Sequence, residues 1–435
     1  MKKTVCLLAA AVFVCACGSS GGARFRLDVN REISAGNFDG AAAKIESQKG
    51  RFYREKDMQM FNLDLGAVRH DGGSPAESDL NFAAAQDSMD NFARSVTQTA
   101  ATVIKNDLTA EYNARQYEQA LTYVYRALNF MDRDDLQGAL VEARKAVFFL
   151  DNQRRTKTSG YNDDPFVQYF ASLIFESGGF LSNARIARTN AVNAYNNFAS
   201  FNNIPPPDFE VPQNADRLGE IIFIHYNGHV PLLASRTVQV AWNNAMLFLH
   251  GSDELLSGEP AVQNALVAGF MGNAVTVAYP VVVPVPYFIR DSSIEVDGNA
   301  RSTILAHDTA AFMRVDLQER MPGIYARMIA RAVIKQVLNN TTRQAVKSTT
   351  NDENLGILAG MIFSAFSAAT ERADTRLWFT LPGEIRMTRM FVQPGKHAVV
   401  FKAFDGRGAL IETKDFGEIE INAGERKYLH YRTGR

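Results

Sequence analysis

Asp374 lies between two arginines, Arg372 and Arg376, where a predicted helix gives way to predicted strands. A carboxylate flanked by guanidinium groups can form a bidentate ion pair, and a buried pair of this kind fixes local geometry. We therefore predict that the three residues form a structural clamp at the helix-to-sheet junction. The alternative interpretation, a ligand site, is less favoured.

Two histidines, His225 and His229, are four residues apart, which on a helix would suit a metal site. The dipeptide Asn227-Gly228 between them is instead typical of a β-hairpin. The sequence also lacks a phosphate-binding loop, a dinucleotide fingerprint and a nucleophile elbow. We therefore expect no catalytic residues, no cofactor, no metal site and no enzymatic activity.

Cys17 ends a segment with the layout of an export signal: a positively charged head, an apolar run over 5–14 and a small residue before the cleavage point. The segment resembles the bacterial lipoprotein signal, because an aliphatic residue, Val14, stands three positions before the cysteine and Ala16 stands directly before it. The resemblance implies that a signal peptide, 1–16, is removed and that Cys17 is acylated.

Other interpretations of this segment are modification of Cys15, a plain secretory signal and a membrane-spanning anchor. The apolar run is about half of the 20 residues that span a bilayer, so we do not expect an anchor helix. Gly18 replaces the aspartate that retains lipoproteins in an inner membrane, which favours the outer membrane with the protein facing the periplasm. We predict a flexible tether over 17–29. All cysteines lie at positions 6, 15 and 17, so the remaining chain has no thiol chemistry.

The composition limits the classes of function. The chain has 435 residues, which predicts two or three domains, and 46% hydrophobic residues, which suffices for a packed core. Its net charge is −1, so electrostatics give no reason to expect nucleic-acid binding.

Residues 30–200 show helical spacing of apolar residues and contain three similar stretches. In each, a helix ends at Gly or Asp, and a second helix carries two small residues seven positions apart, on one face. The pattern resembles the tetratricopeptide family, whose stacked helix pairs bind a peptide or extended segment on a concave face. The alternatives are an ordinary helical bundle and a mere spacer. The small residues are Ser78 and Ala85, Ala139 and Ala146, and Ala184 and Ala191.

A linker rich in Pro and Asn, 201–217, separates this helical domain from a predicted α+β domain, 218–376. In that domain we expect a hairpin over 220–233 and a strand pair formed by 274–279 and 293–298. We also expect an edge or extended segment over 281–286.

Helices should follow over 306–320 and from Pro322 to about residue 346. A basic stripe of Arg327, Arg331 and Lys335 should be a solvated helix face, with a headgroup or wall-polymer contact as the alternative. The apolar run 355–366 predicts a buried helix.

From residue 377 to residue 435, short alternating segments predict a small antiparallel β lobe. The predicted fold class is therefore α+β and multidomain: tetratricopeptide-like helical repeats, then an α+β domain that ends in this lobe.

Two stretches, 316–332 and 372–395, are similar to a family of bacterial lipoproteins in which a tetratricopeptide-like half precedes an α+β half. The resemblance implies an accessory role in the cell envelope, near activators of cell-wall synthesis, and no assigned activity or catalytic residues. We expect a lipid-anchored scaffold or adaptor that binds an envelope protein, a peptidoglycan-synthesis component or a wall polymer. The alternatives are a cell-wall hydrolase and an oligomeric secretion or assembly component.

Overall fold

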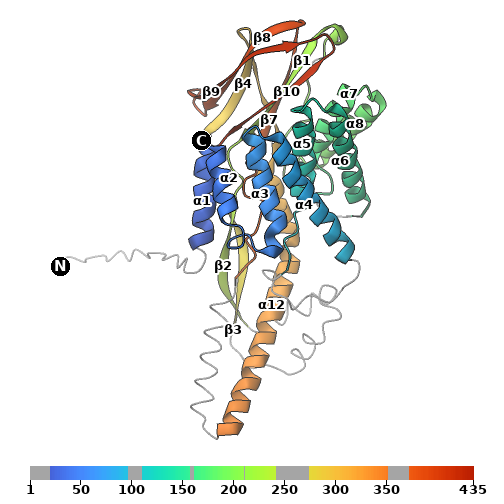
Figure 1. Ribbon diagram of the computed structural model, residues 1–435. Helices are drawn as coiled ribbons and strands as arrows, with labels where there is room; N and C mark the ends of the chain where they lie inside the picture. Colours follow the sequence, from blue (N-terminus) through green and yellow to red (C-terminus); the bar gives the residue numbers. More distant parts are fainter. Residues whose placement is uncertain (1–19, 97–109, 157–160, 210, 242–273, 351–371) are drawn as a thin grey trace, which may run out of the picture.

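The computed structural model describes residues 20–96, 110–156, 161–209, 211–241, 274–350 and 372–435. Within these residues the N-terminal half is helical and the C-terminal half contains the sheets, as the sequence predicts (Figure 1). The predicted signal peptide 1–16, the predicted lipidation site Cys17 and the predicted helix 355–366 lie outside the described residues.

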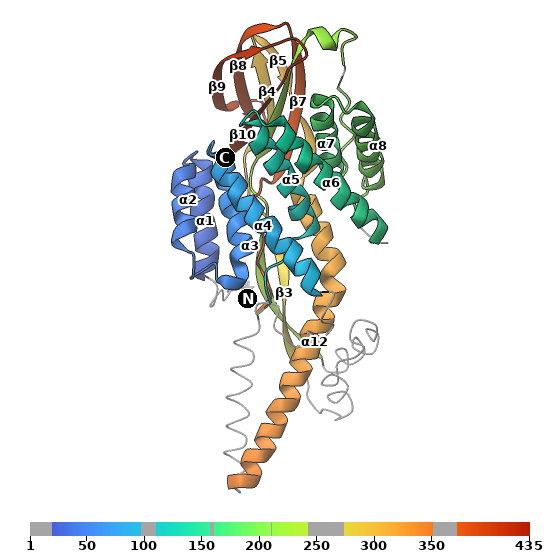
Figure 2. The same cartoon turned by 45° about the vertical axis from the view of Figure 1, so that its right-hand side comes forward.

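Helices α1 to α8 pack against one another in chain order, and the helices of each successive pair are in contact. They lie along an arc across one side of the sheets (Figure 2). The start of α7 shows why helices begin where they do: the Asp164 carboxylate accepts a hydrogen bond from the Val167 amide, and Pro165 takes the first helical position. The bounds are α1 Ser20–Ser34, α2 Phe38–Ser47, α3 Met58–Asp71, α4 Pro75–Val96, α5 Gln116–Met131, α6 Leu136–Thr156, α7 Pro165–Ser177 and α8 Leu181–Asn197.

The small residues predicted at two-turn spacing on the second helix of each pair are all buried. On α4, for example, the Ser78 hydroxyl donates a hydrogen bond of 2.8 Å to the Gly66 carbonyl of α3. Gly66 leaves no spare room, because a Cβ atom there would lie 3.1 Å from the Phe82 ring. Small side chains therefore allow α3 and α4 to pack closely.

The prediction of a flexible tether over 17–29 is wrong for residues 20–29, which belong to helix α1. Val29 and Ile33, four residues apart on that helix, are buried in the core. The Phe25 ring lies 5.9 Å from the Phe379 ring of the C-terminal half. Tertiary burial of this apolar stripe outweighs the flexibility of the Gly- and Ser-rich start.

The described residues form three sheets: one of four strands in the order β10-β1-β7-β6, another of four in the order β5-β4-β8-β9, and the pair β2-β3. The bounds are β1 Gly219–Asn227, β2 Leu232–Ala241, β3 Ala274–Val283, β4 Ile289–Val296, β5 Asn299–Ser302, β6 Ile304–Asp308, β7 Glu384–Val392, β8 Gly395–Asp405, β9 Leu410–Ile421 and β10 Arg426–Thr433.

The predicted boundary between an α+β domain, 218–376, and a separate antiparallel lobe, 377–435, is wrong. Strand β1 lies between β7, to which it is antiparallel, and β10, to which it is parallel. Likewise β4 pairs with β8. Every residue of β1 is buried, so its main-chain hydrogen-bonding groups need a strand partner on each edge. The C-terminal strands supply both partners.

The predicted hairpin over 220–233 is also wrong, because β2 pairs with β3 and not with β1. Asn227 is buried instead of lying at a turn tip: its amide nitrogen donates to the Ile289 carbonyl and its amide oxygen accepts from the Thr433 hydroxyl. The predicted pairing of 274–279 with 293–298 is wrong too, because 274–279 belongs to β3, which pairs with β2, whereas 293–296 belongs to β4 in another sheet. Residues 281–283 form the end of β3, which is an edge strand of the pair β2-β3. This agrees with the edge segment predicted over 281–286 for its first three residues.

A single helix, α12 (Thr309–Thr350), replaces the two predicted helices, and residues 304–308 form strand β6. Its 42 residues give a length of about 63 Å, and the helix projects beyond the sheets in Figure 2. Pro322 lies inside it, where proline costs about 3 kcal/mol. Buried side chains on both sides, such as Phe312 and Ile329, supply packing that outweighs this cost.

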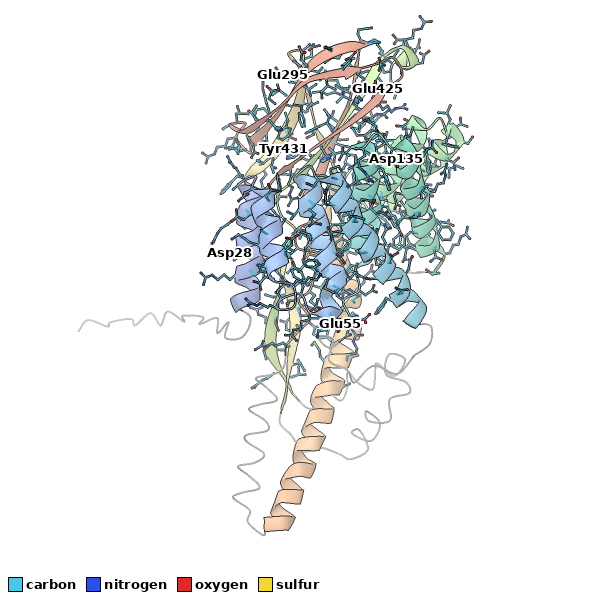
Figure 3. All side chains as sticks on the ribbon, in the orientation of Figure 1. Asp28, Glu55, Asp135, Glu295, Glu425 and Tyr431 are labelled. Carbon is cyan, nitrogen blue, oxygen red and sulfur yellow. The ribbon has the colours of Figure 1, made fainter. Side chains whose placement is uncertain are left out.

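One hydrophobic core runs through both halves, from Val29 in α1 to Tyr428 in β10. Side chains fill the space between the helices and the sheets (Figure 3). The predicted linker 201–217 is mostly irregular, with a 3-10 turn at Ala215–Arg217, but it is packed: the Phe201 ring lies 5.5 Å from the Phe312 ring. The helical and β halves therefore share this core across residues 201–217, while a second cluster of the described residues, which includes Phe223 and Phe401, lies within the β half alone.

Candidate functional site

The extended segment 372–381 lies along helices α1, α3 and α5 and binds them through its main chain. The Arg26 guanidinium donates to the Thr375 carbonyl at 3.0 Å. The Trp378 amide donates to the Glu118 carboxylate at 2.9 Å. The Trp378 side chain is fully buried against the rings of Phe82 and Tyr125.

Two buried carboxylates hold this segment. Asp64 accepts hydrogen bonds from the Thr380 amide at 3.2 Å and from the Tyr53 hydroxyl at 2.9 Å. Burial raises the pKa of Asp64 to about 8 against the opposing effect of these hydrogen bonds. Burial also raises the pKa of Glu118. The Thr380 and Trp378 amides donate to these two side chains, so both serve as acceptors for the chain's own backbone.

The predicted clamp forms in part. Arg376 makes two hydrogen bonds to Asp374, of 2.9 and 2.8 Å, and a third of 2.9 Å to Asp57 at the start of α3. Arg372, the third predicted member, is exposed. The clamp joins segment 372–381 to the helical half, next to a cavity of about 220 Å³ that α12 also lines.

The inner face of the helix stack is thus covered by the protein itself. Helices α3, α5 and α7 are buried along nearly their whole length. Segment 372–381 and strands such as β1 occupy this face, so within the described residues the extended segment that lies on it belongs to the chain itself.

The outer face of the stack is different, because its helices leave large apolar side chains in solvent. Phe148 on α6 is 76% exposed and Ile186 on α8 is 60% exposed. We call the set on α4, α6 and α8 the outer apolar residues. They are Leu80, Val141, Phe148, Leu181, Ile186 and Val192.

His225 and His229, the spaced pair in the sequence, bind different partners in the interior. The His225 ring hydrogen-bonds the Ser292 and Thr433 hydroxyls at 2.9 and 2.8 Å. The His229 ring hydrogen-bonds the Ser34 hydroxyl at 2.9 Å. Burial lowers the pKa of both imidazoles, which are therefore neutral core histidines.

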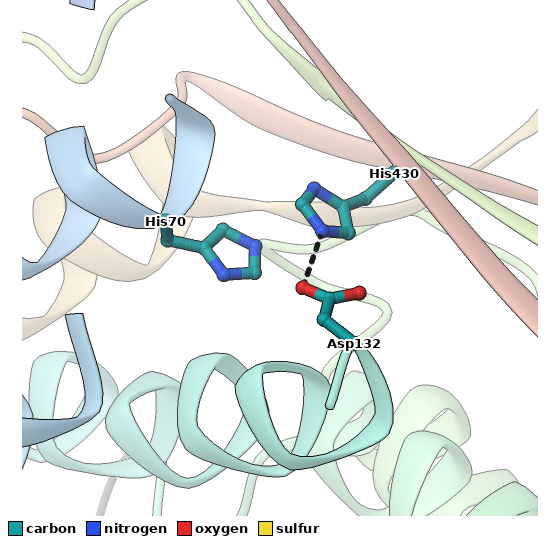
Figure 4. Close-up of side chains that lie close together, drawn as sticks. All are labelled: His70, Asp132 and His430. Atoms are coloured by element: carbon teal, nitrogen blue, oxygen red, sulfur yellow. Dashed lines mark hydrogen bonds and ion pairs between the residues drawn. The ribbon is translucent and has the colours of Figure 1, made fainter. Parts of the chain in front are cut away.

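A different trio, His70, Asp132 and His430, comes together at the junction of the two halves (Figure 4). His70 lies in the last turn of α3, Asp132 follows α5, and His430 lies on β10. The His430 Nε2 atom lies 3.0 Å from an Asp132 carboxylate oxygen, and the two imidazoles stack at 4.1 Å between centroids. Burial, assisted by His430, lowers the pKa of His70 to about 3, so this imidazole is neutral. Two imidazoles and a carboxylate can act as metal ligands.

Sequence reasoning missed this trio, because no local spacing joins its members. Asp132 and His430 are 298 positions apart, and the strand that carries His430 is ordered only by pairing with β1. The expectation of no metal site came from local spacing, such as that of His225 and His229, which does not show residues that are distant in the sequence coming together.

A second histidine–carboxylate pair, His397 and Asp297, lies 2.6 Å apart at the turn-side ends of β8 and β4. The hydrogen bond to Asp297 raises the pKa of His397 above its usual value of 6.5. The pair therefore stabilises the fold below pH 6.5, and this contribution is lost as the pH rises through the folded-state pKa.

We expect Asp297→Asn to lower the pKa of His397 towards 6.5 in an NMR titration. An unchanged pKa would contradict the assignment.

Comparisons with protein-family models, curated proteins and solved structures found no match to this chain. Among the helices of the described residues, none combines the length and the apolar character needed to cross a membrane.

Proposed function

We propose that this protein is a lipid-anchored, non-enzymatic scaffold of the cell envelope. Cys17 would carry the acyl chains and hold the protein at the outer membrane, facing the periplasm. The outer face of a tetratricopeptide-like helix stack would bind another envelope protein, with a component of peptidoglycan synthesis as the expected class.

The observation that carries this proposal is the contrast between the two faces of the helix stack. The inner face is filled by segment 372–381 and the sheets. The outer face exposes Phe148 and Ile186. Contiguous exposed apolar surface is typical of protein–protein contact sites, and we propose that the exposed apolar side chains of α4, α6 and α8 contribute to such a site. A partner that binds the helix stack would therefore use its outer face.

The tetratricopeptide-like description is supported by the buried small residues at two-turn spacing in the three helix pairs from α3 to α8. In stacked repeats such residues let neighbouring helices approach closely, while the remaining surface binds partners. The alternative of a cell-wall hydrolase needs two carboxylates facing an open cleft. Asp64 and Glu118 are instead buried and bonded to segment 372–381. The second alternative, an oligomeric secretion or assembly component, predicts self-association that native mass spectrometry would detect.

The proposal is tested by recovering partners from solubilised membranes, once with the unchanged protein and once with a variant whose outer face carries added charge. We expect the double variant Phe148→Glu, Ile186→Glu to recover at least tenfold less of a stoichiometric partner than the unchanged protein. Lys414→Glu, an exposed change on β9, is the matched control and should recover it fully. If no partner is recovered at stoichiometric yield, or if the double variant retains it, the proposal fails.

Acylation of Cys17 makes a separate prediction. Two or more acyl chains anchor a protein stably, whereas one does not. We expect Cys17→Ser to lose the lipid-modified N-terminal peptide and to leave the membrane fraction on alkaline washing. Mass spectrometry of the N-terminal peptide and fractionation measure the two effects. An unmodified amino terminus in the unchanged protein would contradict the proposed anchor.

A further inference from the structure

We propose that His70, Asp132 and His430 bind one divalent transition-metal ion, best matched by zinc, at the junction of the helical and β halves. This inference is independent of the proposed function. It rests on how the three side chains converge and on an unsatisfied buried nitrogen.

One ligand atom from each residue lies within 4.8 Å of the other two. In a tetrahedral zinc site with bonds of about 2.0–2.1 Å, ligand atoms lie roughly 3.3–3.4 Å apart. Bringing all three onto one ion would need a contraction of up to about 1.5 Å and a rotation of one imidazole out of the stacked arrangement, because the ion must lie in the plane of both rings. Figure 4 shows the His70 ring directed towards Asp132 and His430.

A chain of hydrogen bonds sets which nitrogen of His70 is free. The Ser78 hydroxyl donates to the Gly66 carbonyl, so it must accept from the Asn129 amide nitrogen, 2.8 Å away. The Asn129 amide oxygen therefore faces His70 Nδ1, at 2.7 Å, and accepts its proton. His70 Nε2 is left with a lone pair, as in metal-ligating histidines oriented by an outer partner.

That lone pair has no partner among the described residues. His70 is 1% exposed, and its Nε2 atom makes no hydrogen bond. Leaving a buried polar atom unsatisfied is costly. A metal ion between His70, Asp132 and His430 would satisfy it and displace the proton between His430 Nε2 and Asp132.

The donor set selects the class of ion. Two imidazole nitrogens and one carboxylate oxygen, without thiolate, suit zinc and its neighbours rather than calcium or magnesium. Asp132 and His430 are partly exposed, with 23% and 14% of their side chains in solvent, so water can take the fourth position. Because the ligands come from α3, the end of α5 and β10, the ion would cross-link the two halves.

The test uses the full chain in detergent, stripped of metal and titrated with Co²⁺ and then Zn²⁺. We expect one equivalent of Co²⁺ with the visible absorption of a tetrahedral site, and displacement of Co²⁺ by Zn²⁺. Asp132→Asn and His430→Gln should each weaken binding at least tenfold. Asp297→Asn, which changes another close histidine–carboxylate pair, is the matched control and should bind normally.

Thermal unfolding with and without Zn²⁺ supplies a second readout, because an ion that binds only the folded state raises its melting temperature. We expect Zn²⁺ to raise the melting temperature of the unchanged protein and of Asp297→Asn, and to leave that of Asp132→Asn unchanged. Circular dichroism verifies that each variant is folded. The proposal would be overturned if the unchanged protein bound no metal, or if Asp132→Asn and His430→Gln bound it as tightly as the unchanged protein.

Discussion

Replacement of Trp378 by alanine is expected to lower the free energy of unfolding by about 3–5 kcal/mol, the range for removing a large buried aromatic side chain. Trp378 is fully buried between the helix stack and the sheets, where its ring packs against Phe82 and Tyr125. Its indole nitrogen donates to the Thr380 hydroxyl at 2.9 Å. The substitution would therefore leave a cavity in the middle of segment 372–381 and remove one hydrogen bond of the Thr380 hydroxyl, which would keep its contacts to Asp64.

Urea unfolding followed by far-ultraviolet circular dichroism measures this loss. Phe288→Ala is the control, because Phe288 is 73% exposed and its removal should change stability by less than about 0.5 kcal/mol. Trypsin gives a local readout, since Arg376 lies within the segment, and we expect faster cleavage after Arg376 in Trp378→Ala. A loss no larger than that of the control would mean that the segment does not hold the halves together.

The second large effect is expected at Arg389, whose guanidinium is buried between the helical half and the sheet. It forms an ion pair with Glu220 of β1, and Glu176 of α7 lies 3.5 Å away. Arg426 of β10 binds the other Glu220 oxygen at 2.7 Å. Removing one partner of a buried ion pair costs about 3–5 kcal/mol when the remaining charge loses its compensation, and the lower end of that range applies here because Arg426 would still pair with Glu220. We expect Arg389→Met to lower the free energy of unfolding by this amount.

Lys402→Met provides the comparison, because Lys402 also pairs with a glutamate, Glu295, but at the surface. Surface pairs contribute about 0–1 kcal/mol. Equal losses in the two variants, measured by urea unfolding, would show that the Arg389 network does not stabilise the junction.

The positions of the strands were easier to predict from the sequence than the strands with which they pair. The apolar run 220–225 predicts a strand, and β1 is one, but nothing local shows that its neighbours come from 384–392 and 426–433. The dipeptide Asn227-Gly228 is typical of hairpin turns, yet no hairpin forms here, because the Asn227 side chain is held in the core by its hydrogen bonds. Long-range pairing of this kind leaves no periodic signal in the chain.

The same limit applies to the functional surfaces. Asp374 and Arg376 are two residues apart, so their ion pair was predictable, whereas the third partner, Asp57, lies 319 positions from Arg376. Small residues seven positions apart predicted close helix pairing. They did not show that segment 372–381 would cover the inner face, because its hydrogen bonds use main-chain atoms that every sequence carries.

The central claim, that partners meet the outer face of the helix stack, is tested most directly by photo-crosslinking in living cells. A photoreactive amino acid is placed at position 148, 186 or 414, and the adducts are identified by mass spectrometry. We predict that positions 148 and 186 both capture the same envelope protein and that position 414 does not. Adducts with that protein only at 414, or none at 148 and 186, would contradict the claim.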